Sequence, residues 1–62
     1  MKLEDIKVGT KVVPKKAYKA QYNKPDVSTI ESYSHVITLD NDASSYSPDY
    51  FCENYKLYKE NV

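Results

Sequence analysis

The chain has 62 residues, enough for one domain and too few for a second. Nine lysines balance nine acids, so no overall field favours a polyanionic or polycationic partner. Cys52 is the single cysteine and excludes an internal disulfide, while no apolar stretch approaches the roughly 20 residues that span a bilayer. We therefore expect one cytoplasmic domain over residues 1–62, with no membrane contact.

The first predicted element is a strand over residues 10–15. The only glycine, Gly9, precedes a β-branched stretch, and glycine can take the positive φ that turns the chain into a strand. Pro14 lacks a backbone donor, so we expect this end of the strand to lie at a sheet edge or a bulge.

Residues 17–25 show no clear periodicity and are expected to form a long loop. Tyr18 and Tyr22 are four residues apart, which is the spacing of a helical turn. Pro25 would end such a turn, however, so the loop is preferred over a helix.

A β-hairpin is predicted over residues 27–40, which are rich in β-branched side chains. Ser32, Tyr33 and Ser34 divide this stretch and are expected to form the turn. Both faces of the second strand carry apolar residues, which favours a strongly curved strand inside a small closed barrel. One of those faces is expected to hold His35, Ile37 and Leu39.

The C-terminal part predicts a turn, two strands and a helical turn between them. Asp40, Asn41 and Asp42 have the side chains that favour a turn, and a short strand follows over residues 44–46. Ser47 and Pro48 form a typical helix start, with a capping serine and proline in the first position. The segment is short, so we expect a single 3₁₀ turn before a final strand over residues 54–59.

This order of elements resembles the small SH3-like barrels, many of which are encoded by bacteriophages. The resemblance rests on the opening Ile6-x-x-Gly9-Thr10-x-Val12, on the hairpin over residues 27–40 and on the late segment 46–51. It implies a mostly β fold, a five-stranded SH3-like barrel with a 3₁₀ turn before the last strand, and a binding role. Because the first loop is basic and the chain lacks tryptophan, recognition of proline-rich helices is not expected.

No catalytic, metal or cofactor signature is present in the sequence. His35 and Cys52 have no partners at a recognisable spacing, so we expect an ordinary structural or surface histidine and a cysteine in the core. The acidic stretch from Asp40 begins like a calcium loop, but Ser45 replaces the required glycine and Phe51 the required glutamate. We therefore expect a protein that is not an enzyme and has no cofactor.

Seven tyrosines exceed what one small core requires. Tyr55 or Tyr50 is expected to pack inside with Phe51, and the others to be exposed. Exposed tyrosine is enriched at protein interfaces because its rigid ring adds contact area at little entropic cost. The alternative is that these rings only cap a small barrel. The candidate protein-binding residues are Tyr18, Tyr22, Tyr33, Tyr46 and Tyr58.

The leading hypothesis is a protein-binding module, encoded by a phage, that docks on a host protein in the host cytoplasm and inhibits or redirects it. The alternative is a weak nucleic-acid-binding barrel, in which lysines follow the phosphate backbone while Tyr18 and Tyr22 stack on bases. Pairing of edge strands into a homodimer also stays open. The lysines of the alternative are Lys15, Lys16, Lys19 and Lys24.

Overall fold

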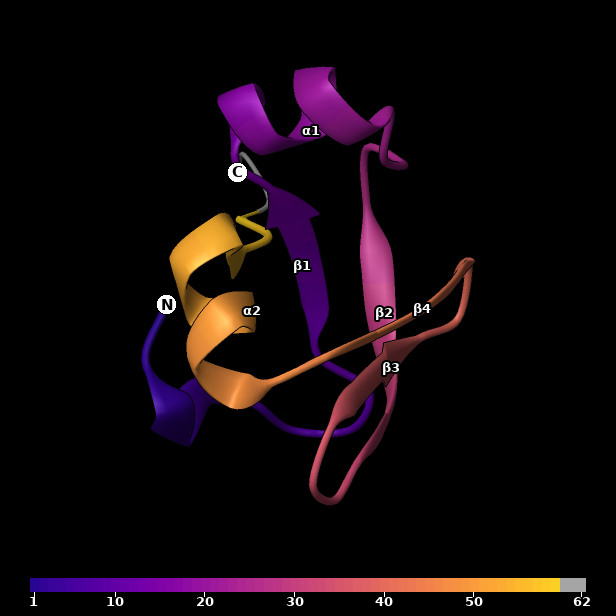
Figure 1. The fold of residues 1–62 in the computed structure, drawn as a ribbon. Helices are drawn as coiled ribbons and strands as arrows, with labels where there is room; N and C mark the ends of the chain where they lie inside the picture. Colours follow the sequence, from indigo (N-terminus) through magenta and orange to yellow (C-terminus); the bar gives the residue numbers. More distant parts are fainter. Residues whose placement is uncertain (60–62) are drawn as a thin grey trace.

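A computed structural model describes residues 1–59 of the chain. Five antiparallel strands form one sheet in the order β4-β3-β2-β1-β5, with α1 across one end and α2 on one side (Figure 1). The prediction of a mostly β fold with five strands is confirmed, whereas the sheet is not closed into a complete barrel. In chain order the elements are η1 (Leu3–Asp5), β1 (Lys11–Pro14), α1 (Lys16–Tyr22), β2 (Ser28–Tyr33), β3 (Ile37–Leu39), β4 (Asp42–Tyr46), α2 (Pro48–Asn54) and β5 (Tyr55–Leu57).

Strand β1 begins and ends as its sequence predicts. Gly9 has a φ of +91°, and its N–H donates to the Ile30 carbonyl oxygen at 2.9 Å, which ties the start of β1 to β2. Alternate residues of a strand point their backbone groups to opposite sides, and those of Val12 point to β2. The missing N–H of Pro14 lies on this same side, beyond Ser28, where β2 begins. Proline is therefore tolerated at the point where β1 has only one neighbour.

The loop predicted for residues 17–25 is wrong, because helix α1 occupies most of it. Pro25 disfavours the helical conformation in the residue before it, and it has no effect on a helix that ends at Tyr22. The sequence of α1 contains two alanines, lysines and a glutamine, all of which favour a helix. Asn23 then ends α1 in the left-handed conformation, and its N–H donates to the Lys19 carbonyl.

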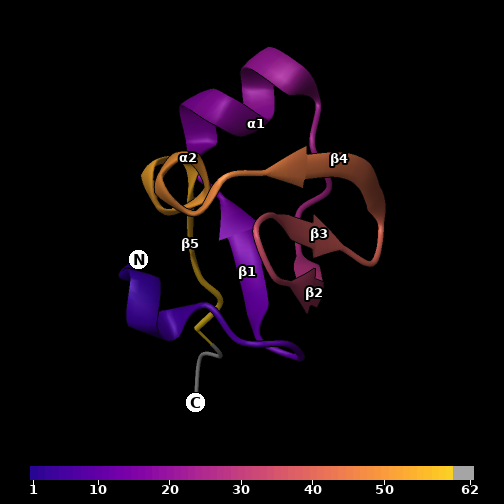
Figure 2. The same ribbon diagram turned by 60° about the horizontal axis from the view of Figure 1, so that its bottom comes forward.

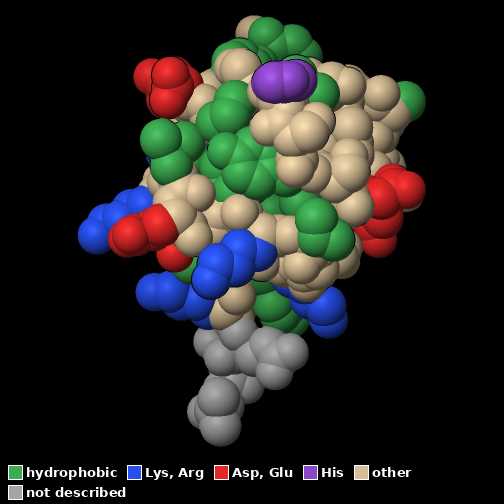
Figure 3. All heavy atoms as spheres, turned by 90° about the horizontal axis from the view of Figure 1, so that it is seen from below, with side chains coloured by type: hydrophobic (Ala, Val, Ile, Leu, Met, Phe, Trp, Pro, Cys, Tyr) green, Lys and Arg blue, Asp and Glu red, His purple; other side chains and the backbone are tan. Residues whose placement is uncertain are grey.

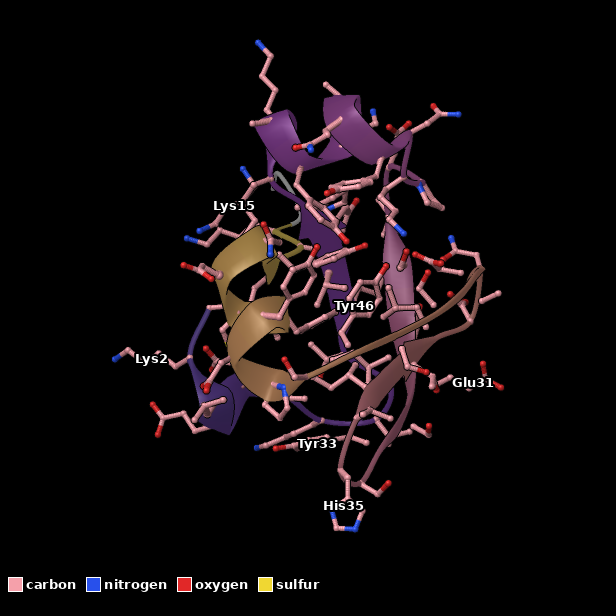
Figure 4. All side chains as sticks on the ribbon, viewed as in Figure 1. Lys2, Lys15, Glu31, Tyr33, His35 and Tyr46 are labelled. Carbon is pink, nitrogen blue, oxygen red and sulfur yellow. The ribbon has the colours of Figure 1, made fainter. Side chains whose placement is uncertain are left out.

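The β2–β3 hairpin turns two residues later than predicted, at residues 34–36. Ser32 and Tyr33 still belong to β2, where they pair with Thr38 and Ile37 of β3. The Ser32 and Thr38 hydroxyls are 2.6 Å apart across the strands, so serine serves here as a strand residue. Figure 4 shows His35 at the tip of this hairpin, so the prediction that it shares a strand face with Ile37 and Leu39 is wrong.

Helix α2 starts at the predicted cap and then runs further than predicted. The Ser47 hydroxyl accepts a hydrogen bond from the Tyr50 N–H at 3.4 Å, and Pro48 takes the first helical position. Instead of a single 3₁₀ turn, α2 is a seven-residue α-helix. The extension buries Phe51, whose ring stacks on Tyr55 with a centroid distance of 4.6 Å. The core contact outweighs the short length of the segment.

The core lies between the curved sheet and α2, and it is rich in aromatic rings. Strand β2 pairs with β1 through its first two residues and with β3 through the rest, so the sheet bends around this core. The predicted short strand and the final strand are both present, as β4 and β5. The buried hydrophobic residues are Ile6, Val12, Tyr18, Ile30, Ile37, Leu39, Tyr46, Phe51 and Tyr55.

Candidate functional site

A groove of about 420 Å³ lies between α1, the end of β4 and the start of α2. Figure 2 shows these elements together, with β4 running under α1 and ending at α2. We call it the tyrosine groove, because four of its eight lining residues are tyrosines. The lining residues are Tyr18, Tyr22, Lys24, Ser44, Ser45, Tyr46, Ser47 and Tyr50.

Helix α1 supplies the first two rings. Tyr18 and Tyr22 are one helical turn apart, and their ring centroids are 5.0 Å from each other. Tyr18 is 8% exposed because it packs edge-on against Tyr55 of the core, at 5.6 Å. Tyr22 is 52% exposed. One face of α1 thus carries a fixed ring next to an accessible one.

Strand β4 and helix α2 supply the other two rings, again one buried and one accessible. Tyr46 is 4% exposed, whereas Tyr50 is 41% exposed. The two rings are stacked with an interplanar angle of 12° and a centroid distance of 6.0 Å. Tyr50 also meets Tyr18 edge-on at 5.9 Å, which joins the two halves of the groove. The groove therefore has a buried aromatic layer under two accessible rings.

An ionic network holds the buried layer in place. The Lys24 ammonium donates to Asp42 Oδ2 at 3.0 Å, and the Tyr46 hydroxyl donates to the same oxygen at 2.5 Å. The Ser44 N–H donates to Asp42 Oδ1 at 3.0 Å. The Tyr55 hydroxyl lies 3.4 Å from that of Tyr46 and is the donor there, because Tyr46 gives its proton to the carboxylate. Lys24 and Asp42 are only 14% and 10% exposed, so solvent screens this pair little.

The environment of the network shifts the pKa values of its ionisable groups further from neutral pH. Burial alone would raise the pKa of Asp42, but the hydrogen bonds from Tyr46, Ser44 and Lys24 outweigh it and lower this pKa to about 2. Burial also opposes the charge on Lys24, yet the hydrogen bond and the attraction of Asp42 leave its pKa raised. Burial, more than any other cause, raises the pKa values of Tyr46 and Tyr55 above the ordinary tyrosine range.

The Lys24 ammonium also lies over two rings of the groove. Its distance to the ring centroid is 5.4 Å for Tyr46 and 5.9 Å for Tyr18. Such contacts between a cation and an aromatic face are attractive, and more so when the cation is largely shielded from water. Lys24 therefore anchors α1, β4 and the buried tyrosines to one another.

The tyrosines expected on the surface divide into two sets. The exposure predicted for Tyr22, Tyr33 and Tyr58 is confirmed, and that predicted for Tyr18 and Tyr46 is wrong. Tyr46 is the residue before the Ser47 cap, a position whose side chain often packs on the fourth helical residue. That residue is Phe51, and its ring centroid lies 5.7 Å from the ring centroid of Tyr46. Figure 4 shows the Tyr46 side chain directed into the molecule. This staple is the sequence signal that would have identified a buried Tyr46.

Tyr50 and Tyr55 also differ in exposure. Tyr55 is fully buried beside Phe51, as predicted, whereas Tyr50 is accessible and lines the groove. Of the five tyrosines proposed from the sequence, the structure brings only Tyr18, Tyr22 and Tyr46 together. Tyr33 lies at the hairpin end, on the opposite side of the molecule from α1 (Figure 4).

Some of the lysines of the nucleic-acid alternative are paired with carboxylates. Lys19 forms a salt bridge with Asp26, and Lys24, whose side chain is 14% exposed, is paired with Asp42 in the groove network. Lys15 and Lys16 are exposed at the start of α1. Two of the four cations are therefore neutralised by neighbouring carboxylates.

The two residues considered for catalysis, His35 and Cys52, differ in their exposure to solvent. His35 is exposed at the hairpin tip, and Cys52 is half-buried against the core, where burial raises the pKa of its thiol. No cluster of three histidine, cysteine, aspartate or glutamate side chains suited to a metal ion occurs within residues 1–59.

Comparisons with protein-family models, curated proteins and solved structures each found no match for this chain. In the part of the chain that the structure describes, neither helix has the length and apolar character needed to cross a bilayer. The function therefore has to be inferred from the geometry of the chain's own residues.

Proposed function

We propose that this chain is a non-catalytic module that binds another protein through the tyrosine groove. The observation that carries the proposal is the pair of accessible rings, Tyr22 and Tyr50, held over the buried rings of Tyr18 and Tyr46. Rings fixed in this way lose little conformational freedom when a partner covers them. Binding energy at protein interfaces is concentrated in such aromatic anchors.

The chemistry of the lining supports binding over catalysis. A general acid or base works best when its pKa lies near the operating pH. In the network that supports this lining, the pKa of Asp42 is lowered to about 2, and those of Tyr46 and Tyr55 are raised. The serine hydroxyls and the two accessible tyrosine hydroxyls instead offer donors and acceptors to a polar partner surface.

We further propose that the open sheet is an SH3-like barrel. Two features support this. Strand β2 pairs with β1 at its start and with β3 along the rest of its length, and β1 pairs with both β2 and β5. The α-helix in place of the 3₁₀ turn departs from the pattern that the sequence resembles. That the partner is a host protein, that the chain inhibits or redirects it, and that a phage encodes it are expectations of the resemblance and stay predictions.

The nucleic-acid alternative gains no support from the arrangement of its residues. Tyr18 is buried, Lys24 is paired with Asp42, and Lys19 is paired with Asp26. A nucleic-acid footprint needs free cations beside exposed rings. We therefore place protein binding first.

The test compares three immobilised forms of the protein. These are the parent chain, the double variant Tyr22→Ala/Tyr50→Ala, and the control Tyr33→Ala, which removes a similarly exposed tyrosine outside the groove. A protein from a bacterial lysate that is retained by the parent and the control, but lost from the groove variant, is the expected result. Its affinity for each form, measured by calorimetry, should fall at least about 30-fold in the groove variant, because anchor residues contribute about 2 kcal/mol or more.

The variants remove exposed rings and leave the buried network intact, so all three forms should melt at similar temperatures. Equal retention of the same partner by the groove variant and the parent would refute the proposal. Binding of single-stranded DNA that weakens steeply with salt, and only in the parent, would favour the nucleic-acid alternative.

A further inference from the structure

Strand β5 leaves part of its backbone free at the outer edge of the sheet. It is the last strand in the sheet order and pairs only with β1. The Tyr58 N–H donates to the Lys11 carbonyl, and the Lys15 N–H donates to the Asn54 carbonyl. In this register the even-numbered residues of β5 exchange hydrogen bonds with β1, so the N–H and C=O of Leu57 point away from it.

The Leu57 backbone groups have no hydrogen-bond partner among residues 1–59. The neighbouring surface is a second groove of about 660 Å³, formed between η1 and β5. We call it the β5-edge groove. Its apolar lining comes from Met1, Val13, Leu57 and Tyr58, of which Tyr58 is 39% exposed. An extended backbone with an apolar side chain would fill both the free hydrogen-bonding positions and this lining.

Lysines surround the same groove. Lys2, Lys56 and Lys59 line it and are exposed, and the Lys11 ammonium lies 6.0 Å from the centroid of the Tyr58 ring. Among residues 1–59, Asp5 is the single acid of the lining, and its carboxylate accepts a hydrogen bond from the Lys2 backbone N–H. Figure 3 shows lysine side chains along one border of the lower face of the molecule, with acidic side chains beside some of them. The charge at this groove therefore favours an anionic partner.

We propose that the β5-edge groove is a second binding site, which takes an extended acidic segment of a partner protein as an added strand. The segment would pair with the Leu57 backbone, place an apolar side chain against Val13 and Tyr58, and direct flanking aspartates or glutamates to the lysines. This site lies at the opposite end of the sheet order from β4, which lines the tyrosine groove. It is independent of the function proposed above.

A peptide accounts for all three features of the edge together. A nucleic acid or an anionic lipid headgroup would satisfy the lysines, but neither explains the free strand backbone beside an apolar lining. A second copy of this chain would satisfy the backbone without explaining why the lysines Lys2, Lys56 and Lys59 gather there.

The test uses a short peptide of alternating glutamate and valine, blocked at both ends and labelled with fluorescein. We expect binding in the micromolar range at low salt, and at least about tenfold weaker binding of the matching lysine–valine peptide. The double variant Lys56→Glu/Lys59→Glu should also bind the acidic peptide about tenfold more weakly, because reversing exposed charges changes affinity while leaving the fold intact. The variant Tyr22→Ala/Tyr50→Ala should bind it like the parent.

Amide hydrogen exchange separates strand addition from loose electrostatic attraction. The saturating peptide should slow exchange of the Leu57 amide at least about tenfold, with little change in the other strands. Absence of binding at millimolar peptide, equal binding by the charge-reversed variant, or unchanged exchange at Leu57 would each overturn the proposal. The proposal would also be overturned if dimerisation of the free protein protected the Leu57 amide. Binding of anionic vesicles or DNA to the same lysines, without binding of the peptide, would overturn it too.

Discussion

The tyrosine groove and the β5-edge groove are built from the same residue types, lysine and tyrosine, and use them in opposite ways. In the tyrosine groove, Lys24 and Tyr46 are buried and locked to one carboxylate. At the β5 edge, Lys56 and Tyr58 are exposed, and the Lys11 ammonium lies 6.0 Å from the centroid of the Tyr58 ring. Exposure to water decides the difference: a buried charge must be paired, whereas an exposed one stays available to a partner.

The largest expected effect compares one lysine from each groove. Lys24→Ala should lower the free energy of unfolding by roughly 2 to 3 kcal/mol, because it leaves the buried Asp42 carboxylate without its cation. Lys56→Ala removes an exposed charge and should change it by less than about 0.5 kcal/mol. Urea denaturation at pH 7 measures both. Equal effects in the two variants would show that the groove network adds nothing to stability.

Acidification should affect the tyrosine groove more than the β5 edge. The pKa of Asp42 in the folded protein is about 2, below its ordinary value of 3.8, so the folded state favours the carboxylate. The resulting stability is complete above about pH 4 and is lost as the pH falls through about 2, an effect of about 2 kcal/mol.

Denaturation curves between pH 5 and about pH 2 test this expectation against the variant Asp42→Asn, which cannot titrate at that position. The parent should lose stability with falling pH more steeply than the variant over this window. Parallel pH profiles would mean that Asp42 has an ordinary pKa in the folded protein.

The smallest effect concerns single hydroxyl groups. Tyr46→Phe should cost about 1.5 kcal/mol, because it removes the hydrogen bond to the Asp42 carboxylate and leaves the ring in place. Tyr58→Phe removes an exposed hydroxyl and should cost almost nothing. The comparison is made from melting temperatures, and a loss in Tyr58→Phe as large as that in Tyr46→Phe would contradict the division between the two grooves.

Much of the fold was predictable because local chemistry decides it. Gly9 before β1, the Ser47 cap and the β-branched hairpin each fix a local conformation without help from distant residues. Helix α1 was missed because Pro25 was given more weight than the helix formers before it, although Asn23 ends the helix first. The length of α2 depends on the burial of Phe51, a tertiary contact that local sequence does not reveal.

The candidate site was less predictable than the fold. The exposure of Tyr22 and the interior position of Tyr55 were both predicted, with Tyr50 as the alternative to Tyr55. The immediate neighbours of Tyr55, Asn54 and Lys56, are polar, and only its alternation with Leu57 in the last strand indicates an interior ring. The pairing of Lys24 with Asp42 joins residues 18 positions apart, and no spacing rule connects them. The free edge at Leu57 depends on the hydrogen-bonding register of β5, which is set only when β1 and β5 meet.

Strand β2 has a consequence for how the molecule unfolds. Its first two residues pair with β1 and its later residues pair with β3, and the N–H of Ile30, between them, donates to the Thr10 carbonyl. Neither set of strands can separate while β2 keeps its shape, so both sides of the sheet should melt in one cooperative transition. The Ile30 amide should then become accessible to solvent only through global unfolding, which makes β2 the last segment of the chain to open.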